Sequence, residues 1–358
     1  MGVSDNIFFI DPVKVRSDVI FRQTHLNLRT ALFFSSSPYG GPSAIAYSSH
    51  GSSWEVSVQT ASGRNLSTIK VANLFALHWT RCHRLVIVGS KGRIYVYNPL
   101  GKLKSQFIMD KEISIMESRT FLGPGGATGL AVLTENNRIF VVNSVLEPVP
   151  WRISDIIRSG KPSAWNVITS PSSQISVLLV IGDSFYAAMQ GVTAQPVTVN
   201  WKLPGGEYVD IIPYWDYSRV AFAHSSGIIQ VVNSDFTILS VISVNDEIPP
   251  SSLTAGNIFW CGMDAVAIKS SRSSLQILSF TSEHYTFNYG SDIRIDAEVD
   301  GVKVFSCDEL IFLSPVPEDV ESVLGIASAE PGAILFEASE KLEKGLYGVY
   351  EYIHMIGQ

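Results

Sequence analysis

The sequence predicts an all-β fold, a β-propeller of about seven blades that is followed by a short helical segment. Runs of four to seven residues rich in Val, Ile, Tyr and Phe alternate with Gly, Asn and Asp, which supply the positive φ of tight hairpins. Propeller blades of four strands take about 40–50 residues. Seven strong turns predict seven blades, with six as the alternative. The turns fall near Gly51, Gly92, Asn137, Asp183, Gly227, Ser273 and Cys307, at intervals of 41, 45, 46, 44, 46 and 34 residues.

Each unit has the same order: an inner strand, a middle strand, the hairpin, a third strand and then an outer strand. In the second unit we expect strands at residues 74–79, 85–89, 94–97 and 106–109. In the fifth unit we expect them at residues 208–214, 219–223, 228–232 and 238–244. A closed ring leaves few free sheet edges, which suits a chain so rich in apolar strands. We therefore expect either the N-terminal strand or residues 26–34 to close the ring with the last blade.

The strand pattern ends after Phe312, where Pro315, Val316 and Pro317 make a break before a helical pattern begins. Pro317 precedes Glu318, Asp319 and Glu321, and acidic side chains are favourable in the first turn of a helix. Residues 333–344 carry apolar side chains at helical spacing, and a helical pattern returns at residues 350–355. We expect a β-propeller over residues 1–315 and an α-helical neck over residues 316–358. The neck looks like the truncated start of an α-solenoid that should continue.

Composition excludes several classes of protein. Charged residues make up 16% of the chain, against about 25% in a typical soluble domain, and hydrophobic residues 46%, so disorder is not expected. A net charge of −7 disfavours a nucleic-acid partner. The longest apolar run, at residues 175–181, is too short to cross a membrane. Three distant cysteines predict small, buried, free thiols in a reducing compartment, so we expect a cytoplasmic protein.

No catalytic, cofactor or metal site is expected. The seven histidines are scattered over different units and form no HxH or HExxH motif, and no GxSxG elbow occurs. The glycine-rich stretch from Leu122 to Gly129 resembles a phosphate loop, but no Lys-Ser/Thr follows it and it leads into a strand. It is therefore expected to be a loop between strands.

Charge is unevenly distributed along the chain. Residues 56–109 contain no acid and eight basic side chains, whereas residues 292–351 contain 14 acids and four basic residues. These are either solvated faces or a basic patch on the second blade that meets an acidic protein or an anionic membrane. Exposed aromatic residues in the loops of the fifth blade are further candidates. The predicted interaction residues are Arg81, Arg84, Lys91, Arg93, Lys102, Lys104, Trp215 and Tyr217.

Several segments resemble one known family, in its order and at its spacings, from residue 37 to the end of the chain. Residues 37–44 match its "PYGGP" segment, residues 259–266 its "WCGMD" strand and residues 300–306 its "DGVRIFS" strand. Residues 316–328 and 331–338 match the helices that leave its propeller. The chain therefore resembles the N-terminal region of the vacuolar protein sorting-associated protein 16 family. It departs from that family in lacking a "YYRK" segment near its start and in its basic second blade.

The resemblance implies a scaffold without catalytic activity. Members of that family are core subunits of the HOPS and CORVET class C tethering complexes, which act between endosome and lysosome or vacuole and support SNARE-mediated fusion. It also implies peripheral association with late endosome and lysosome membranes, and partnership with the other class C subunits. The Sec1/Munc18-like subunit is expected to need the solenoid, which this chain lacks.

Two alternatives belong to other classes of protein. One is a generic WD-like propeller adaptor outside membrane traffic, which the helical neck and the family segments disfavour. The other is a propeller enzyme with its active site at the central channel. Carboxylates or histidines that converge in a central cleft would support the enzyme.

Overall fold

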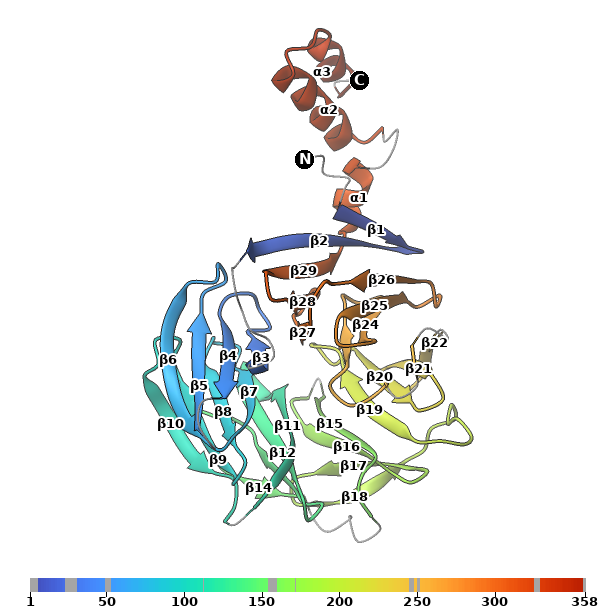
Figure 1. The fold of residues 1–358 in the computed structure, drawn as a ribbon. Coiled ribbons are helices and arrows are strands. Elements are labelled where there is room, and N and C mark those ends of the chain that lie inside the picture. Colours follow the sequence, from blue (N-terminus) through green and yellow to red (C-terminus); the bar gives the residue numbers. More distant parts are fainter. Residues whose placement is uncertain are drawn as a thin grey trace.

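A computed structural model describes residues 6–22, 31–48, 53–111, 113–153, 160–170, 172–244, 248–249, 252–324 and 329–356. Its strands form seven antiparallel sheets arranged around a central axis, with helices α1 to α3 projecting beside the seventh sheet (Figure 1). The space along this axis, between the innermost strands, is called the channel below. The fold is a seven-bladed β-propeller, as the sequence predicts, and the six-bladed alternative is wrong.

The strands of each blade follow one another outward from the channel. The innermost strands are β3 (Ala31–Ser36), β7 (Leu74–Trp79), β11 (Ile115–Leu122), β15 (Ala164–Thr169), β19 (Tyr208–Pro213), β23 (Ile258–Trp260) and β27 (Arg294–Ala297). The second strands are β4 (Ser43–Ser48), β8 (Leu85–Gly89), β12 (Thr128–Thr134), β16 (Ile175–Ile181), β20 (Arg219–His224), β24 (Ala265–Lys269) and β28 (Val302–Phe305).

The third and outer strands complete the blades. The third strands are β5 (Ser53–Gln59), β9 (Arg93–Tyr97), β13 (Ile139–Val142), β17 (Ser184–Met189), β21 (Ile228–Asn233), β25 (Ser274–Ser279) and β29 (Glu309–Pro315). The outer strands of the first six blades are β6 (Asn65–Ala72), β10 (Leu103–Ile108), β14 (Trp151–Arg152), β18 (Val192–Val197), β22 (Ile238–Ser243) and β26 (His284–Asn288).

The N-terminus closes the ring. β2 (Val13–Arg22) pairs antiparallel with β29, with Val15 opposite Pro315 and Arg22 opposite Glu309, and β1 (Ile7–Ile10) adds a fifth strand outside it. The first of the two expected closures is therefore confirmed. Most of residues 26–34 lies outside the described residues, and β3 belongs to the first blade.

Burial follows the position of a strand in its blade. All five residues of β8 are buried, β9 alternates buried side chains with exposed or half-buried ones, and most of the outer strand β10 is exposed. The buried apolar residues form seven clusters, one between each pair of neighbouring blades. Between the seventh and first blades, Phe34 stacks on Phe305 with ring centroids 4.8 Å apart. The core is therefore a ring of interfaces rather than one centre.

Three tryptophans on innermost strands form hydrogen bonds between neighbouring blades. These bonds join the first blade to the second, the third to the fourth and the fifth to the sixth. The indole N–H of Trp79 donates to the Ser35 carbonyl at 3.0 Å, and that of Trp260 to the Ile212 carbonyl at 2.9 Å. The Trp165 indole donates to Glu117 Oε2 at 2.8 Å. In each case the acceptor lies on the innermost strand of the preceding blade. A buried indole N–H needs such an acceptor, and these bonds fix how neighbouring blades meet.

Loops alternate between the two faces of the ring. Face A carries the loops between first and second strands, such as 80–84 and 214–218, and those between third and fourth strands, such as 98–102. Face B carries the hairpins between second and third strands, such as 90–92 and 225–227. The predicted turns fall in these face B hairpins, except Gly51, which lies outside the described residues.

Three helices follow β29: α1 (Glu318–Leu324), α2 (Pro331–Glu343) and α3 (Val349–Ile356). The side chain of Lys14 on β2 forms an ion pair with Glu321 of α1. α2 contacts α3, and Lys341 lies over the Tyr352 ring, 4.0 Å from its centroid. No helix in the described part of the chain is both long and apolar enough to pass through a bilayer.

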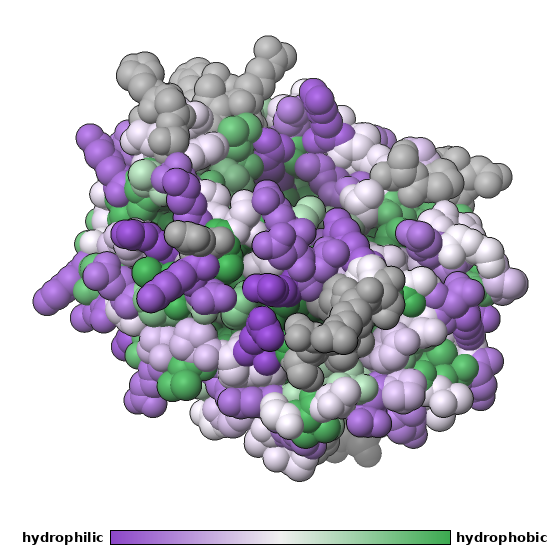
Figure 2. Space-filling view, turned by 90° about the horizontal axis from the view of Figure 1, so that it is seen from below, coloured by the Kyte–Doolittle hydropathy of each residue, from purple (hydrophilic) through white to green (hydrophobic). Residues whose placement is uncertain are grey.

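The rim of the ring opposite the helices carries hydrophilic side chains interspersed with small hydrophobic areas (Figure 2).

All three cysteines are free: Cys261 is buried, Cys307 is half-buried, and Cys82 is exposed on face A. The prediction of buried thiols is therefore wrong for Cys82, because the tight 80–84 loop turns its side chain outward.

Candidate interaction site at the mouth of the channel

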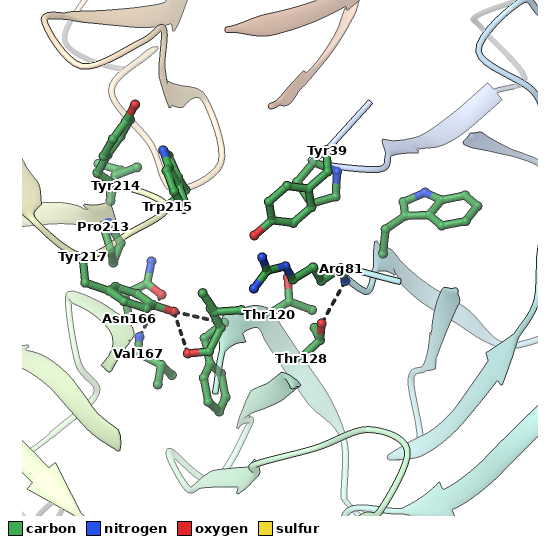
Figure 3. A pocket seen from close by; sticks show the side chains of 15 residues that line it. Tyr39, Arg81, Thr120, Thr128, Asn166, Val167, Pro213, Tyr214, Trp215 and Tyr217 are labelled. Atoms are coloured by element: carbon green, nitrogen blue, oxygen red, sulfur yellow. Dashed lines mark hydrogen bonds between the residues drawn. The ribbon is translucent and has the colours of Figure 1, made fainter. Parts of the chain in front are cut away.

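The mouth of the central channel on face A holds a pocket of about 240 Å³. Loops and strand ends of the first five blades line it. Figure 3 shows the Arg81 guanidinium and the Tyr39 hydroxyl pointing into the opening, with Trp215 and Tyr217 across from them. Three of the predicted interaction residues, from the second and fifth blades, therefore meet in one place.

The basic side of the pocket is held by neighbouring blades. The backbone N–H of Arg81 donates to Thr128 Oγ1 at 3.0 Å, and its guanidinium lies 5.5 Å from the centroid of the Tyr39 ring. Burial raises the pKa of the Tyr39 phenol, and the charge of Arg81 partly offsets this effect. Tyr39 therefore keeps its proton and can donate a hydrogen bond into the pocket.

The glycine-rich loop gives Arg81 room. Gly125 and Gly126 adopt φ values of +66° and +77°, which favour glycine. A Cβ at Gly126 would lie 3.1 Å from Nη1 of Arg81, closer than side-chain contacts normally allow. The loop leads into β12, as expected for a connection between strands.

The aromatic side of the pocket combines a fixed and an exposed ring. The Tyr217 hydroxyl accepts the N–H of Leu122 at 2.6 Å and donates to its carbonyl at 3.3 Å, and burial raises its pKa to about 12. Tyr217 thus braces the fifth blade against the third. Trp215 leaves 46% of its surface exposed, so its ring is available to a partner.

The other predicted residues lie apart from the pocket. Arg84 and Lys102 are on face A loops of the second blade, and Lys104 is on its outer strand. Lys91 and Arg93 lie at the face B end of the same blade, where they line a groove of about 430 Å³ together with Lys70. The second blade therefore presents its basic residues on two faces and an edge, because adjacent strands run in opposite directions.

A second polar cluster lies on innermost strands of the third, fourth and fifth blades, next to the residues that line the pocket. Side chains alternate along a strand, so Glu117 and Arg119 of β11 point the same way. Arg119 Nη2 lies 2.8 Å from Asp210 Oδ1 and 3.6 Å from Glu117 Oε2, and its guanidinium lies over the Trp165 ring at 5.7 Å. Asp210 is 1% exposed and also accepts the N–H of Gly256. Sequence reasoning missed this cluster, whose members come from three different blades.

Titration in this cluster is governed by burial. Burial raises the pKa of Asp210, an effect that Arg119 opposes. His78, which hydrogen-bonds Ser118 at 2.8 Å, has its pKa lowered to about 4 by burial and by the nearby charge of Arg119. The His78 imidazole is therefore neutral, and the carboxylates of Glu117 and Asp210 both accept hydrogen bonds. Within the described residues, no group of three His, Cys, Asp or Glu side chains could hold a metal ion.

Two of the C-terminal acids are interior rather than solvated. Asp296 on β27 accepts the N–H of Ser36 at 2.6 Å, across the seam between the seventh and first blades, and burial raises its pKa to about 6. Glu298 is buried in an ion pair with Lys303. Part of the acidic excess between residues 292 and 351 is therefore structural, not a surface charge.

Solved structures match the fold. The Cps50 (Swd1) β-propeller domain of Myceliophteria thermophila has a TM-score of 0.57 and 10% identity, covering 82% of this chain and 98% of that one. A virginiamycin B lyase from Staphylococcus aureus has a TM-score of 0.55 and 10% identity, covering 84% of this chain and 100% of that one. Since one of these is an enzyme and identity is low, the likeness shows the fold alone.

Curated relatives match most of the chain. The vacuolar protein sorting-associated protein 16 homologue of Caenorhabditis elegans is 28% identical over 96% of this chain, and that of Drosophila melanogaster 24% over 89%. The chain spans only 41% and 40% of those two proteins. The family model described as Vps16, N-terminal region, matches residues 10–358. The chain therefore belongs to the Vps16 N-terminal region family.

Proposed function

We propose that the chain is a non-catalytic interaction scaffold of vacuolar protein sorting, the propeller arm of a HOPS- or CORVET-type tethering subunit. In this role it supports vesicle tethering between endosome and lysosome or vacuole and the SNARE-mediated fusion that follows. The observation that carries the proposal is the family match over residues 10–358, together with relatives named for vacuolar protein sorting.

The channel supports a scaffold rather than an enzyme. The converging acids that an enzyme would need are present, but Arg119 pairs with Asp210, and Glu117 accepts the Trp165 indole. Asp210 is closed to solvent. A catalytic acid or base must reach its substrate, and these groups instead hold three blades together.

The proposed scaffold divides its contacts between two parts. Residues 1–315 form the propeller, and residues 316–358 form the helical neck. The Sec1/Munc18-like subunit docks on the solenoid of the longer relatives, and other class C subunits contact the rest of the protein. The protein is cytoplasmic and peripherally bound to late endosome and lysosome or vacuole membranes.

Blade two supplies a basic surface for a second contact, with an anionic membrane or an acidic protein. Lys91 and Arg93 of this blade line one groove together with Tyr95, Tyr97 and Lys70, which lies on the outer strand of the neighbouring first blade. Residues 56–109 contain no acid; the nearest acids are Glu55, opposite Lys70 on the adjacent strand, and Asp110, which lines a groove with Lys91, Arg93 and Lys111. Clustered basic side chains near an anionic surface contribute about 1 kcal/mol each.

Affinity purification of the tagged chain from its source cells, beside a longer form that includes the solenoid, tests the scaffold role. We expect the longer form to recover the Sec1/Munc18-like and other tethering subunits, and this chain to recover at most subunits that touch the propeller. Recovery of no trafficking subunit by either form would contradict the assignment and favour the adaptor alternative.

Vesicle flotation tests the basic surface. Replacing Lys70, Lys91 and Arg93 by Gln should lower binding to phosphatidylserine vesicles. A control variant removes three exposed charges elsewhere, by Gln at Arg138, Lys161 and Arg272. Equal binding of both variants would show that net charge, not this groove, determines membrane contact.

A further inference from the structure

The pocket at the channel mouth has an unbalanced charge. Among the described residues that line it, Arg81 is the only charged side chain. No ion pair joins its guanidinium to a carboxylate in the part of the chain that the structure describes; it lies over the Tyr39 ring instead. By contrast, Arg119 next to the pocket and Arg219 on the rim both pair with aspartates, at 2.8 Å each. Arg81 is thus held in place yet lacks the anionic partner that other arginines near the channel have.

The opposite side of the pocket is apolar. Trp215 is half-exposed, and Ile212 and Pro213 line the same side of the pocket. Asp216 follows Trp215 at the rim, where its carboxylate accepts hydrogen bonds from Ser218. A second acid is therefore unfavourable on this side, so a ligand should carry its negative charge at the Arg81 end.

The volume of the pocket and the number of its hydrogen-bond donors indicate the class of ligand. Pockets for whole small molecules take about 300–1,000 Å³, and this one, at about 240 Å³, suits the anchoring side chains of a larger partner. Phosphorylated peptides are bound by clusters of arginines, whereas a single guanidinium can donate two hydrogen bonds to the two oxygens of one carboxylate. The single arginine of this pocket therefore suits a carboxylate. The Tyr39 hydroxyl adds one further donor.

We propose that this pocket binds a short segment of a partner protein in which an Asp or Glu stands next to a large apolar residue. The carboxylate accepts hydrogen bonds from Arg81 and Tyr39, and the apolar side chain packs on Trp215. The inference rests on the proposed scaffold role in one respect: the channel mouth is a contact surface and not a catalytic one.

An array of acetylated octapeptides identifies the preferred sequence. Each peptide carries one pair of natural residues at its two central positions and Gly or Ser elsewhere, and the tagged chain is applied to the array. We expect the strongest signals from pairs of Asp or Glu with Leu, Ile, Phe or Trp. An array without a preference for acids, or with no signal above background, would overturn the proposal.

Solution binding of the best peptide, followed by fluorescence polarisation, assigns the residues. Arg81→Gln should weaken binding about 10- to 100-fold, as expected for a lost hydrogen bond to a charged group. The peptide with Gln in place of its acid should bind the natural chain equally weakly and lose little more on the variant. Tyr39→Phe and Trp215→Ala should each weaken binding several-fold.

Arg84→Gln is the matched control, because Arg84 lies on the same loop but does not line the pocket. It should bind the peptide like the natural chain, and equal losses for Arg84→Gln and Arg81→Gln would overturn the proposal. The two proposals can fail separately. Peptide binding without recovery of trafficking subunits would overturn the tethering role alone, and recovery without acid-dependent peptide binding would overturn this inference alone.

Discussion

The propeller ring and the helical pair beside it differ in how they bury apolar surface. The ring has a buried cluster between every two neighbouring blades, and even its N-terminal strand contributes Val15, which is fully buried. The described part of α2 buries only Ala333 and Ala338, while Leu342 is 68% exposed and Tyr350 of α3 is 81% exposed. The ring is therefore stabilised by its own interfaces, and the helices depend on few internal contacts.

The largest expected effect comes from placing the same charge in each region. Val15→Asp buries a carboxylate among apolar side chains at the closing strand, and should cost about 5 kcal/mol or more, or prevent folding. Leu342→Asp lies on an exposed helix face and should change the free energy of unfolding by less than about 0.5 kcal/mol. Urea denaturation followed by tryptophan fluorescence compares the two. Similar losses would mean that ring and helices unfold as one unit.

The second-largest effect concerns the contribution of the ion pair between Arg119 and Asp210 to the free energy of unfolding. Arg119→Met leaves Asp210 buried without its partner and should cost about 3–5 kcal/mol. The double variant Arg119→Met, Asp210→Asn should recover part of this loss, because no uncompensated charge remains. Equal stability of the single and double variants in urea would show that Asp210 takes up a proton once Arg119 is removed, so that no uncompensated charge is left in either variant.

The free energy of unfolding should depend on pH through a buried acid at the seam between the seventh and first blades. Burial raises the pKa of Asp296 from 3.8 to about 6, so the folded state favours the protonated acid. The stability it contributes is present below about pH 3.8 and is lost as pH rises through about 6, which amounts to about 3 kcal/mol. The unfolding free energy of the natural chain, relative to that of Asp296→Asn, should therefore fall by about 2 kcal/mol between pH 4 and pH 7.5, because a small part of the loss has already occurred at pH 4. A difference that stays constant with pH would contradict this assignment.

The smallest effect concerns a single bond between blades. Trp79→Phe keeps an aromatic ring at the interface of the first two blades but removes the indole N–H that bonds Ser35. Leaving that carbonyl unpaired should cost about 1–2 kcal/mol, measured by thermal unfolding. Tyr350→Phe, on the exposed helix, removes a polar group as a control and should leave Tm unchanged.

Local patterns predicted the ring well because each blade is built from neighbouring residues. Hairpin spacing identified the turns between second and third strands, and the helical periods after residue 315 identified α1 to α3. The closing strand was predicted only as one of two options, since its partner lies about 300 residues away. Hairpin chemistry says nothing about a pairing at that distance.

The pocket was only partly predictable from sequence. Arg81, Trp215 and Tyr217 were each selected for charge or exposure, but nothing local indicated that they meet, or that Tyr39 joins them. Their proximity arises from the closure of the ring, which brings equivalent loops of different blades around one axis. An alignment of the repeat units would have been the useful signal, because Tyr39, Arg81 and Trp215 all lie in the loop between the first and second strands of their blades.

The pairing of β2 with β29 also affects synthesis on the ribosome. Val15 meets Pro315, so the N-terminal strand must wait until 300 further residues have been made. At about 5–20 residues per second this delay is roughly 15–60 s. During that time β2 has one strand, β1, to pair with, and its other edge is free to aggregate. Nascent chains of this protein should therefore need a chaperone until the last blade emerges.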